Sequence, residues 1–396
     1  PNTTNQALAF FNQTGTVWDG RKLNNPTNLS SAWSTVAAPA VNEGNPWAQR
    51  HFDGSNYLFA DGHVKWLKHS GSDDRPASAD VDYDCDGVMG TATSNDGRRP
   101  GRILTMFLFS YFRFGIEGLH LALSDDGLQW RALNENHPVY ASPLGVRSIR
   151  DPFVMRDAGD RFHLYATNGW SSTACFHTIS DDLVHWCEAE LLPLMEHVPG
   201  ARNVWAPECF CDGDGTYHLV WSSSTAETVD ALHDWNQRAW FASSRDLANW
   251  TLAAPLFDFG FSVIDPTFAL QDDGWILMAF KDERGKNRGH ENEASVQSKA
   301  IKIAHAPALC GPWQIDKGFI SPNLCEGPTL FWRDDSELGE GWTVLFDHFG
   351  AFGFGASHSP DGKNWTDISH RLNMVGGRPH HGGVLEISLE EAARLE

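Results

Sequence analysis

Three acidic residues stand in short phrases that contain proline or glycine and that recur along the chain. They are Asp151 in Arg-Asp-Pro-Phe, Asp265 in Val-Ile-Asp-Pro-Thr and Glu326 in Cys-Glu-Gly-Pro-Thr. Hydrolysis of a glycosidic bond needs one carboxylic acid to donate a proton and one carboxylate to activate water or attack. A third carboxylate nearby can raise the pKa of the acid by like-charge repulsion. We therefore predict that Asp151, Asp265 and Glu326 are catalytic.

The same phrases mark a repeat. Pro207-Glu208-Cys209 and His381-Gly382-Gly383 complete a series whose ionisable residues are 57, 57, 61 and 55 positions apart. A single Asp-Pro can simply cap a turn, whereas five phrases at a nearly constant spacing favour a common structural position. A repeat of about 50 to 60 residues that opens with a strand is typical of a β-propeller, in which each repeat is one sheet. Such a ring would place four carboxylates and one histidine around one axis.

A second set of motifs supports this repeat. In each repeat a short apolar strand is followed by a turn rich in Ser, Asp, Gly or Pro and then by a tryptophan; these are Trp130, Trp186, Trp250, Trp313 and Trp365. A more apolar segment precedes each motif, and no segment has the helical period that an α/β fold would need. The predicted fold class is all-β, with a five-bladed β-propeller at residues 99–396. Residues 384–387 are expected to complete the blade of residues 103–140, because closing the ring removes two unpaired edges.

Residues 1–98 are expected to form a separate β-containing appendage and linker. His51 and the pair Asp61-Gly62 are separated by nine residues, a run that resembles the C-terminal signature of bacterial pseudopilin-like proteins. The Asp-Gly turn predicts a hairpin in which Tyr57–Phe59 pairs with Val64–Trp66.

Composition limits the classes of partner. The formal net charge is −21, from 30 basic and 51 acidic residues, which disfavours nucleic acid and anionic membranes as partners. The printed chain opens at Pro1 without the charged and apolar segments of a signal peptide, so none is expected within it. The seven cysteines form no metal-binding pattern, although Cys175 and Cys187 flank a predicted hairpin and could pair. The oligomeric state stays open.

Residues 103–390 resemble the five-bladed family 43 glycoside hydrolases. The resemblance rests on the phrases quoted above and on Trp205-Ala206-Pro207. It implies that Asp151 is the general base, that Asp265 orients the acid and tunes its pKa, and that Glu326 is the general acid. It also implies that His381 lies near the axis beside a calcium ion. Members of the family commonly carry Asp after Trp-Ala-Pro, where this chain has Glu208, so the role of Glu208 stays open.

The resemblance implies an inverting hydrolase that releases terminal sugars from polysaccharides or oligosaccharides, with α-L-arabinofuranosides or β-D-xylosides as favoured substrates. Exo-β-galactanase or galactofuranosidase activity is the alternative among enzymes, and a catalytically inactive, glycan-binding propeller is the alternative of another class. Arg150-Asp151-Pro152 and Glu208-Cys209 also resemble motifs of the retaining, invertase-like fructan enzymes. That scheme leaves Asp265 and Glu326 unexplained. An extracellular or periplasmic location in a bacterium is expected.

Further polar and aromatic residues near the phrases are candidates for binding sugar. They are Arg150, Trp170, Trp205, Glu208, Phe261 and Arg378. The charged, glycine-containing stretch Lys281–Ser298 is expected to be a mobile loop that gates the site.

Overall fold

The computed structural model describes residues 54–58, 64–68, 105–225, 235–285, 299–349 and 353–396. The chain divides into two units, Pro1–Leu104 and Thr105–Glu396. Within the first, β1 (Gly54–Leu58) pairs antiparallel with β2 (Val64–Lys68), and Leu58 lies opposite Val64. The predicted hairpin is confirmed over these residues, whereas Phe59 and the Asp61-Gly62 turn lie outside the described residues. The predicted boundary at residues 98–99 also lies outside them and stays a prediction.

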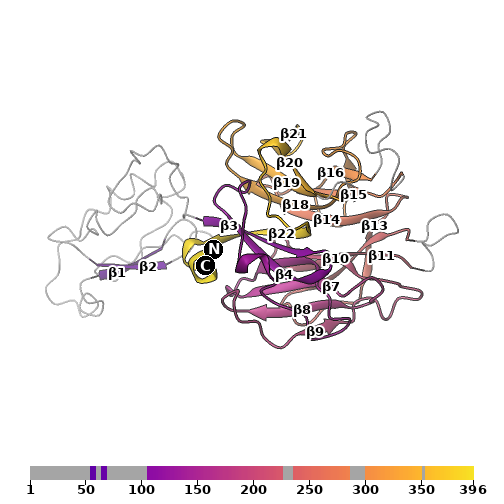
Figure 1. Ribbon diagram of the computed structural model, residues 1–396, viewed down its shortest axis with the longest axis horizontal. Coiled ribbons are helices and arrows are strands. Elements are labelled where there is room, and N and C mark those ends of the chain that lie inside the picture. Colours follow the sequence, from indigo (N-terminus) through magenta and orange to yellow (C-terminus); the bar gives the residue numbers. More distant parts are fainter. Residues whose placement is uncertain (1–53, 59–63, 69–104, 226–234, 286–298, 350–352) are drawn as a thin grey trace, which may run out of the picture. The chain divides into compact units, whose positions relative to one another are not determined.

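The described part of Thr105–Glu396 forms five antiparallel sheets of four strands each, so the predicted five-bladed propeller is confirmed (Figure 1). Blade I consists of β22 (Pro379–Ser388), β3 (Thr105–Arg113), β4 (Ile116–Ser124) and β5 (Arg131–Ala132). Blade II consists of β6 (Arg150–Arg156), β7 (Phe162–Thr167), β8 (Cys175–Ser180) and β9 (Glu190–Leu192). Blade III consists of β10 (Trp205–Cys211), β11 (Tyr217–Ser223), β12 (Arg238–Ser244) and β13 (Ala254–Phe257). Blade IV consists of β14 (Val263–Leu270), β15 (Ile276–Asp282), β16 (Ala300–Ala306) and β17 (Gln314–Ile315). Blade V consists of β18 (Glu326–Arg333), β19 (Gly341–His348), β20 (Gly353–Ser359) and β21 (Thr366–Asp367).

Three short helices complete the described elements: the 3-10 helices η7 (Asn134–Asn136) and η8 (Ser369–Arg371), and α2 (Leu389–Leu395). The α2 helix begins with a capping box in which Ser388 and Glu391 satisfy each other's backbone donors. Glu391 also forms an ion pair with Arg156 of β6 at 2.7 Å. Cys175 and Cys187 are both free thiols, so the disulfide considered from the sequence does not form. No helix in the described part of the chain is long and apolar enough to cross a membrane.

The second strand of each blade is buried on both faces, which explains why these strands are the most continuous apolar runs of the sequence. Successive side chains of a strand point to opposite faces, and here each face packs against a different neighbouring blade. Two adjacent residues of each strand therefore lie in two different hydrophobic clusters. These pairs are Leu108 and Phe109, Leu164 and Tyr165, Leu219 and Val220, Ile276 and Leu277, and Val344 and Leu345. The five clusters thus join the blades into a ring.

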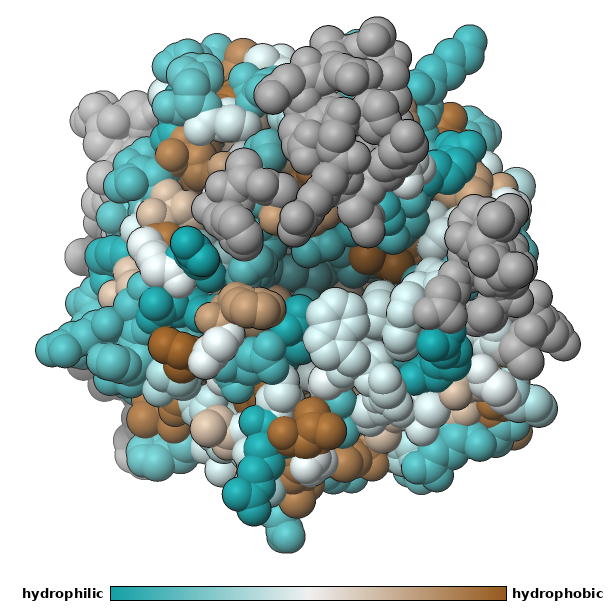
Figure 2. Space-filling view, turned by 45° about the vertical axis from the view of Figure 1, so that its right-hand side comes forward, coloured by the Kyte–Doolittle hydropathy of each residue, from teal (hydrophilic) through white to brown (hydrophobic). Residues whose placement is uncertain are grey.

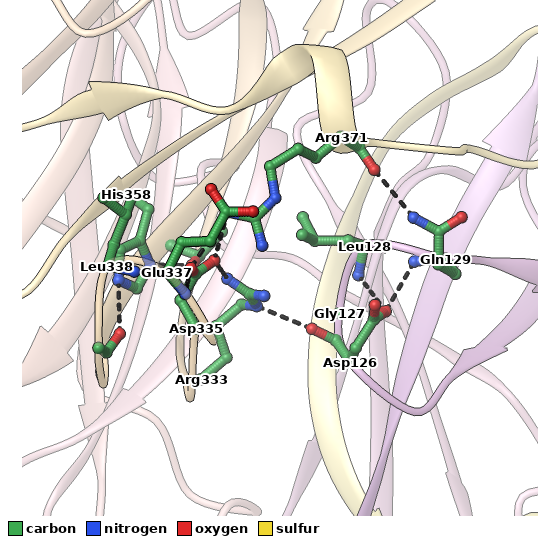
Figure 3. Close-up of polar contacts among 12 residues, drawn as sticks. Asp126, Gly127, Leu128, Gln129, Arg333, Asp335, Glu337, Leu338, His358 and Arg371 are labelled. Carbon is green, nitrogen blue, oxygen red and sulfur yellow. Dashed lines mark hydrogen bonds and ion pairs between the residues drawn. The ribbon is translucent and has the colours of Figure 1, made fainter.

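Strand β22 closes this ring. It pairs with β3, with Val384 opposite Phe109 and Leu385 opposite Leu108, which confirms the predicted closure. A polar clasp between blades V and I adds to the closure (Figure 3). Asp335, whose side chain is fully buried, forms ion pairs with Arg333 at 2.7 Å and Arg371 at 3.0 Å. Arg333 then donates to the backbone oxygen of Asp126 at 2.7 Å, and burial of Arg333 and Asp335 makes their charge pairing matter for stability.

All five inner strands carry a β-bulge near their start. The residues that the bulges leave unpaired are Asp151-Pro152, Ala206-Pro207, Asp265-Pro266, Gly327-Pro328 and His381. Glu326 therefore stands one residue before its bulge, and Glu208 stands just after its own. The alignment that places all five ionisable residues at one repeat position is wrong, because the structural repeat is set by the bulge and not by the charge. The repeat position that precedes the bulge is held by Arg150, Trp205, Ile264, Glu326 and His380.

Candidate active site

Bulges aim the acidic side chains at the axis of the ring. Asp151 and Asp265 adopt positive φ values of 46° and 53°, a conformation that costs on the order of 1–3 kcal/mol for residues other than glycine. The proline that follows each of them disfavours the helical region for its predecessor and so helps to fix an irregular backbone. Acidic residues with a strained backbone at a β-bulge are typical of functional sites.

His381 links the two aspartates. Its Nδ1 lies 3.6 Å from Oδ1 of Asp151 and 4.0 Å from Oδ2 of Asp265. The backbone N–H of Gly327 donates to Oδ2 of Asp265 at 3.0 Å, which connects Asp265 to the start of the Glu326 strand. Residues from β6, β14, β18 and β22 therefore meet at one place, although they lie up to 230 positions apart in the sequence.

Thr167 orients Asp151. The hydroxyl of Thr167 donates to Oδ2 of Asp151 at 2.7 Å and accepts from the backbone N–H of Ala206 at 2.8 Å. Because Ala206 supplies a proton to this hydroxyl, the hydroxyl's own proton points to Asp151. This hydrogen bond fixes the position of one carboxylate oxygen of Asp151. Its other oxygen, Oδ1, faces His381.

The acidic side chains differ in how far they reach solvent. Glu326 is 29% exposed and Asp151 is 16% exposed, whereas Asp265 is only 7% exposed. Glu208 is buried as well. Glu326 and Asp151 are thus the two carboxyl groups that a substrate in the mouth of the propeller reaches most easily, and Asp265 supports them from below.

Burial shifts the proton affinities of the inner groups. It raises the pKa of Asp265 to about 7, although the positive charges of His381 and Lys281 lower this pKa. Burial likewise raises the pKa of Glu208 to about 8. Burial alone would lower the pKa of His381, but the surrounding carboxylates, led by Asp265 and Asp151, raise it above its ordinary value. Perturbed titration of several groups in one mouth is typical of active sites.

Lys281 is a site residue that the sequence did not reveal. Its Nζ lies 2.7 Å from Oε2 of Glu326, and its side chain is only 4% exposed. Lys281 and Asp282 belong to β15, so the prediction that a mobile loop starts at Lys281 is wrong. Residues 286–298 of that stretch lie outside the described residues.

His380 and Asp347 form a second pair beside Glu326. Asp347 lies opposite Glu326 in the sheet, and its Oδ2 is 2.7 Å from Nδ1 of His380. Burial raises the pKa of Asp347 to about 6. Burial would lower the pKa of His380, but Asp347 raises it. The one sequence signal for His380 is that it precedes His381, since nothing near Asp347 in the sequence marks it as a site residue.

Three of the predicted sugar-binding residues, Arg150, Trp170 and Trp205, lie together. Arg150 forms an ion pair with Glu117 at 2.6 Å, and its guanidinium lies 5.0 Å from the centre of the Trp170 ring. Trp170 is 61% exposed and meets Trp205 edge-on at 5.3 Å between ring centres. Trp205 in turn stacks on Trp235 at 4.9 Å. Exposed aromatic rings of this kind suit the apolar faces of sugars.

Other predicted residues lie elsewhere or stay untested. Phe261 packs beside Phe259, and the guanidinium of Arg284 lies 3.8 Å from its ring centre. Arg378 adopts a φ of 58° immediately before β22. Sugar binding by Arg150, Trp170, Trp205, Glu208, Phe261 and Arg378 stays a prediction.

Calcium at His381 also stays a prediction. Calcium takes six to eight oxygen ligands, whereas His381 offers a nitrogen that faces two carboxylates. Within the described ranges, no three or more His, Cys, Asp or Glu side chains are grouped so as to hold a metal ion.

Five blades with carboxyl groups at bulged inner strands around one axis define a propeller of the glycosidase type. The family model that matches residues 103–393 is described as a probable glycosyl hydrolase domain and is related to glycoside hydrolase family 43. The chain belongs to this family.

Solved structures give distant matches. A thermostable family 43 glycoside hydrolase is 20% identical with a TM-score of 0.43, over 58% of this chain and 75% of that one. The endo-arabinase of Bacteroides thetaiotaomicron is 14% identical with a TM-score of 0.47, over 69% of this chain and 91% of that one. An exo-β-1,3-galactanase of Clostridium thermocellum is 14% identical with a TM-score of 0.48, over 67% of this chain and 59% of that one. A search of curated proteins finds no match.

Proposed function

We propose that the protein is an inverting glycoside hydrolase that releases terminal sugars from polysaccharides or oligosaccharides. The observation that carries the proposal is the meeting of Asp151, Asp265 and the Glu326 strand around His381. Membership in a family of glycosyl hydrolases supports it.

Asp151 acts as the base in this scheme. Thr167 holds one of its oxygens, and the carboxylate of Asp151 takes a proton from the water that attacks the anomeric carbon. Glu326, the most exposed of the carboxyl groups described above, donates a proton to the leaving oxygen. Asp265 keeps its place through the N–H of Gly327 and, in this scheme, orients the acid.

The resemblance to family 43 favours α-L-arabinofuranosides or β-D-xylosides as substrates. β-Galactans and galactofuranosides are the alternatives among substrates. The aromatic wall of Trp170, Trp205 and Trp235 supports a carbohydrate ligand whatever the sugar. A location outside the cytoplasm, where polysaccharides occur, is part of the same proposal.

A panel of nitrophenyl glycosides tests this function. Wild-type protein should release nitrophenol from at least one of the arabinofuranoside, xyloside, galactoside and galactofuranoside substrates. The Asp151→Asn variant should lose this activity while keeping its thermal stability. Glycan binding without hydrolysis of any member of the panel would instead favour a catalytically inactive, glycan-binding propeller.

A further inference from the structure

Lys281 lies in a buried ionic chain behind the proposed acid. Its Nζ is 2.6 Å from Oε1 of Glu283 and 2.7 Å from Oε2 of Glu326. The same ammonium lies 4.4 Å from the centre of the Phe349 ring. A buried ammonium loses its hydration. Here its interactions with two carboxylates and an aromatic face compensate for the lost water.

A second lysine completes the chain. Lys299 lies 2.8 Å from Oε2 of Glu283, so two lysines and two glutamates alternate and their charges balance. The backbone oxygen of Lys299 accepts from the N–H of Cys325 at 3.0 Å, and Cys325 is the residue before Glu326. The ionic chain therefore holds both the side chain of Glu326 and the backbone that carries it.

We propose that Lys281 is a positioning residue that holds the carboxyl group of Glu326 at the mouth and stabilises the carboxylate that forms as its proton leaves. This inference rests on the proposed function, since it takes Glu326 as the proton donor. A fixed cation beside the place where negative charge develops needs no reorganisation during the reaction. Burial makes that cation more effective than it would be in water.

The persistence of the charge on Lys281 is supported by its surroundings. Burial alone would lower the pKa of Lys281, but Glu283 and Glu326 raise it above its ordinary value. Burial would raise the pKa of Glu283, but Lys281 and Lys299 lower it. Both partners thus stay ionised over the range in which a glycosidase works.

Other charged groups also face Glu326 from the elements around it. Asp265 of β14 and Asp347 of β19 repel its charge, whereas His380 and His381 of β22 attract it when they are protonated. Removal of Lys281 takes away the positive charge that lies 2.7 Å from Oε2 of Glu326, so in the variant Glu326 should release its proton at higher pH. The pH above which activity falls must then rise.

The test is the pH dependence of kcat/KM for Lys281→Met and Lys281→Gln. We expect the alkaline limb of the profile to move to higher pH by about one to three units. We also expect a larger loss of kcat for glycosides with poor leaving groups than for those with good ones. Thermal melting shows which of the two variants is folded, and Lys281→Gln keeps a polar side chain if the Met variant does not fold.

Lys302→Met is the matched control. Lys302 is a buried lysine of β16 in the same blade, and it contacts the backbone oxygens of Lys317 and Gly318 and the Phe319 ring. Among the residues that the structure describes, no contact joins it to Glu326, so this variant should leave the alkaline limb in place. An equal shift in Lys302→Met would show that loss of any buried charge in the blade is enough, and would overturn the proposal.

A double variant separates the groups on which Lys281 acts. In the Glu326→Gln background, measured with a good leaving group, Lys281→Met should cause no further shift. A shift that persists there would mean that Lys281 acts through Asp265 or Asp347. A uniform loss of activity with an unmoved limb would make Lys281 purely structural; either result overturns the inference. Failure of the proposed function would look different, because the wild type itself would hydrolyse no glycoside.

Discussion

Substitution of Gly327 by alanine should damage the site, because the added Cβ would lie too close to His381. A Cβ at Gly327 would lie 2.5 Å from Cγ and 2.6 Å from Cβ of His381, whereas ordinary van der Waals contact begins at 3.4 Å. The imidazole must therefore retreat by up to about 0.9 Å. His381 is buried and its Nδ1 is 3.6 Å from Asp151, so this retreat separates groups that meet around the reacting atoms. A displacement of this size costs on the order of 10²-fold in rate.

The backbone needs a separate control. Gly327 has a φ of 53°, which costs alanine roughly 1–2 kcal/mol. Gly274 has a φ of 82° in the turn before β15, and no atom of the described residues lies within 4 Å of the position that a Cβ would take there. Gly274→Ala should therefore lose similar stability in chemical unfolding and keep its kcat. Equal kcat values for the two variants would refute the claim that the packing of His381 against Gly327 positions the catalytic groups.

Three further outcomes are expected. Glu326→Gln should slow hydrolysis by roughly 10²–10⁴-fold for poor leaving groups and much less for good ones; equal losses across a leaving-group series would show that Glu326 is not the acid. Asp335→Ala leaves Arg333 buried without its carboxylate and should cost about 3–5 kcal/mol in urea unfolding, whereas Glu337→Ala, at an exposed site 3.9 Å from Arg371, should cost less than about 1 kcal/mol. Burial would raise the pKa of Asp335, but its hydrogen bonds, led by that from Arg333, lower this pKa. The stability that Asp335 contributes is therefore present above its unfolded pKa of about 4 and is lost as the pH falls below that value. An Asp335→Ala variant whose stability depends on acid in the same way as that of the wild type would contradict this. A chain that begins near Arg102 should keep its hydrolytic activity, and loss of folding on that deletion would make residues 1–98 part of the folded core.

The blades could be predicted from sequence because their pattern is local. Each second strand packs on both faces, so it reads as one apolar run, and the turn before each tryptophan contains the residues that tight turns need. In four blades a serine hydroxyl and an aspartate two residues later cap this turn, as Ser124 with Asp126 and Ser180 with Asp182 do. The surface is less informative, since hydrophobic residues are scattered among hydrophilic ones on the face that Figure 2 shows.

The register of the mouth could not be predicted from the charges. Glu208 follows a proline and Glu326 precedes a glycine, so they occupy different sides of the bulge although both belong to a similar phrase. The prolines at 152, 207, 266 and 328 were the better signal, because each follows the residue that the bulge forces into positive φ.

Site residues that pair across long stretches of the chain left little signal in the sequence. Lys281 is charged and precedes a glycine-containing stretch, which favours a loop, and its partner Glu326 lies 45 residues further on. Asp347 and His380 are 33 residues apart. Such pairs arise only when the blades close into a ring, so carboxyl groups near the bulges could be proposed from the sequence, whereas the groups that hold them could not.

The stereochemistry of the product tests the central claim most directly. If Asp151 activates water and Glu326 donates the proton, a water molecule must fit between Asp151 and the anomeric carbon, and the carboxyl groups should lie about 6.5–9.5 Å apart. Proton NMR of the sugar released first should then show the inverted anomer. A retained anomer would mean that Asp151 attacks the sugar itself, which would contradict the account and favour the invertase-like scheme with Glu208 as the acid.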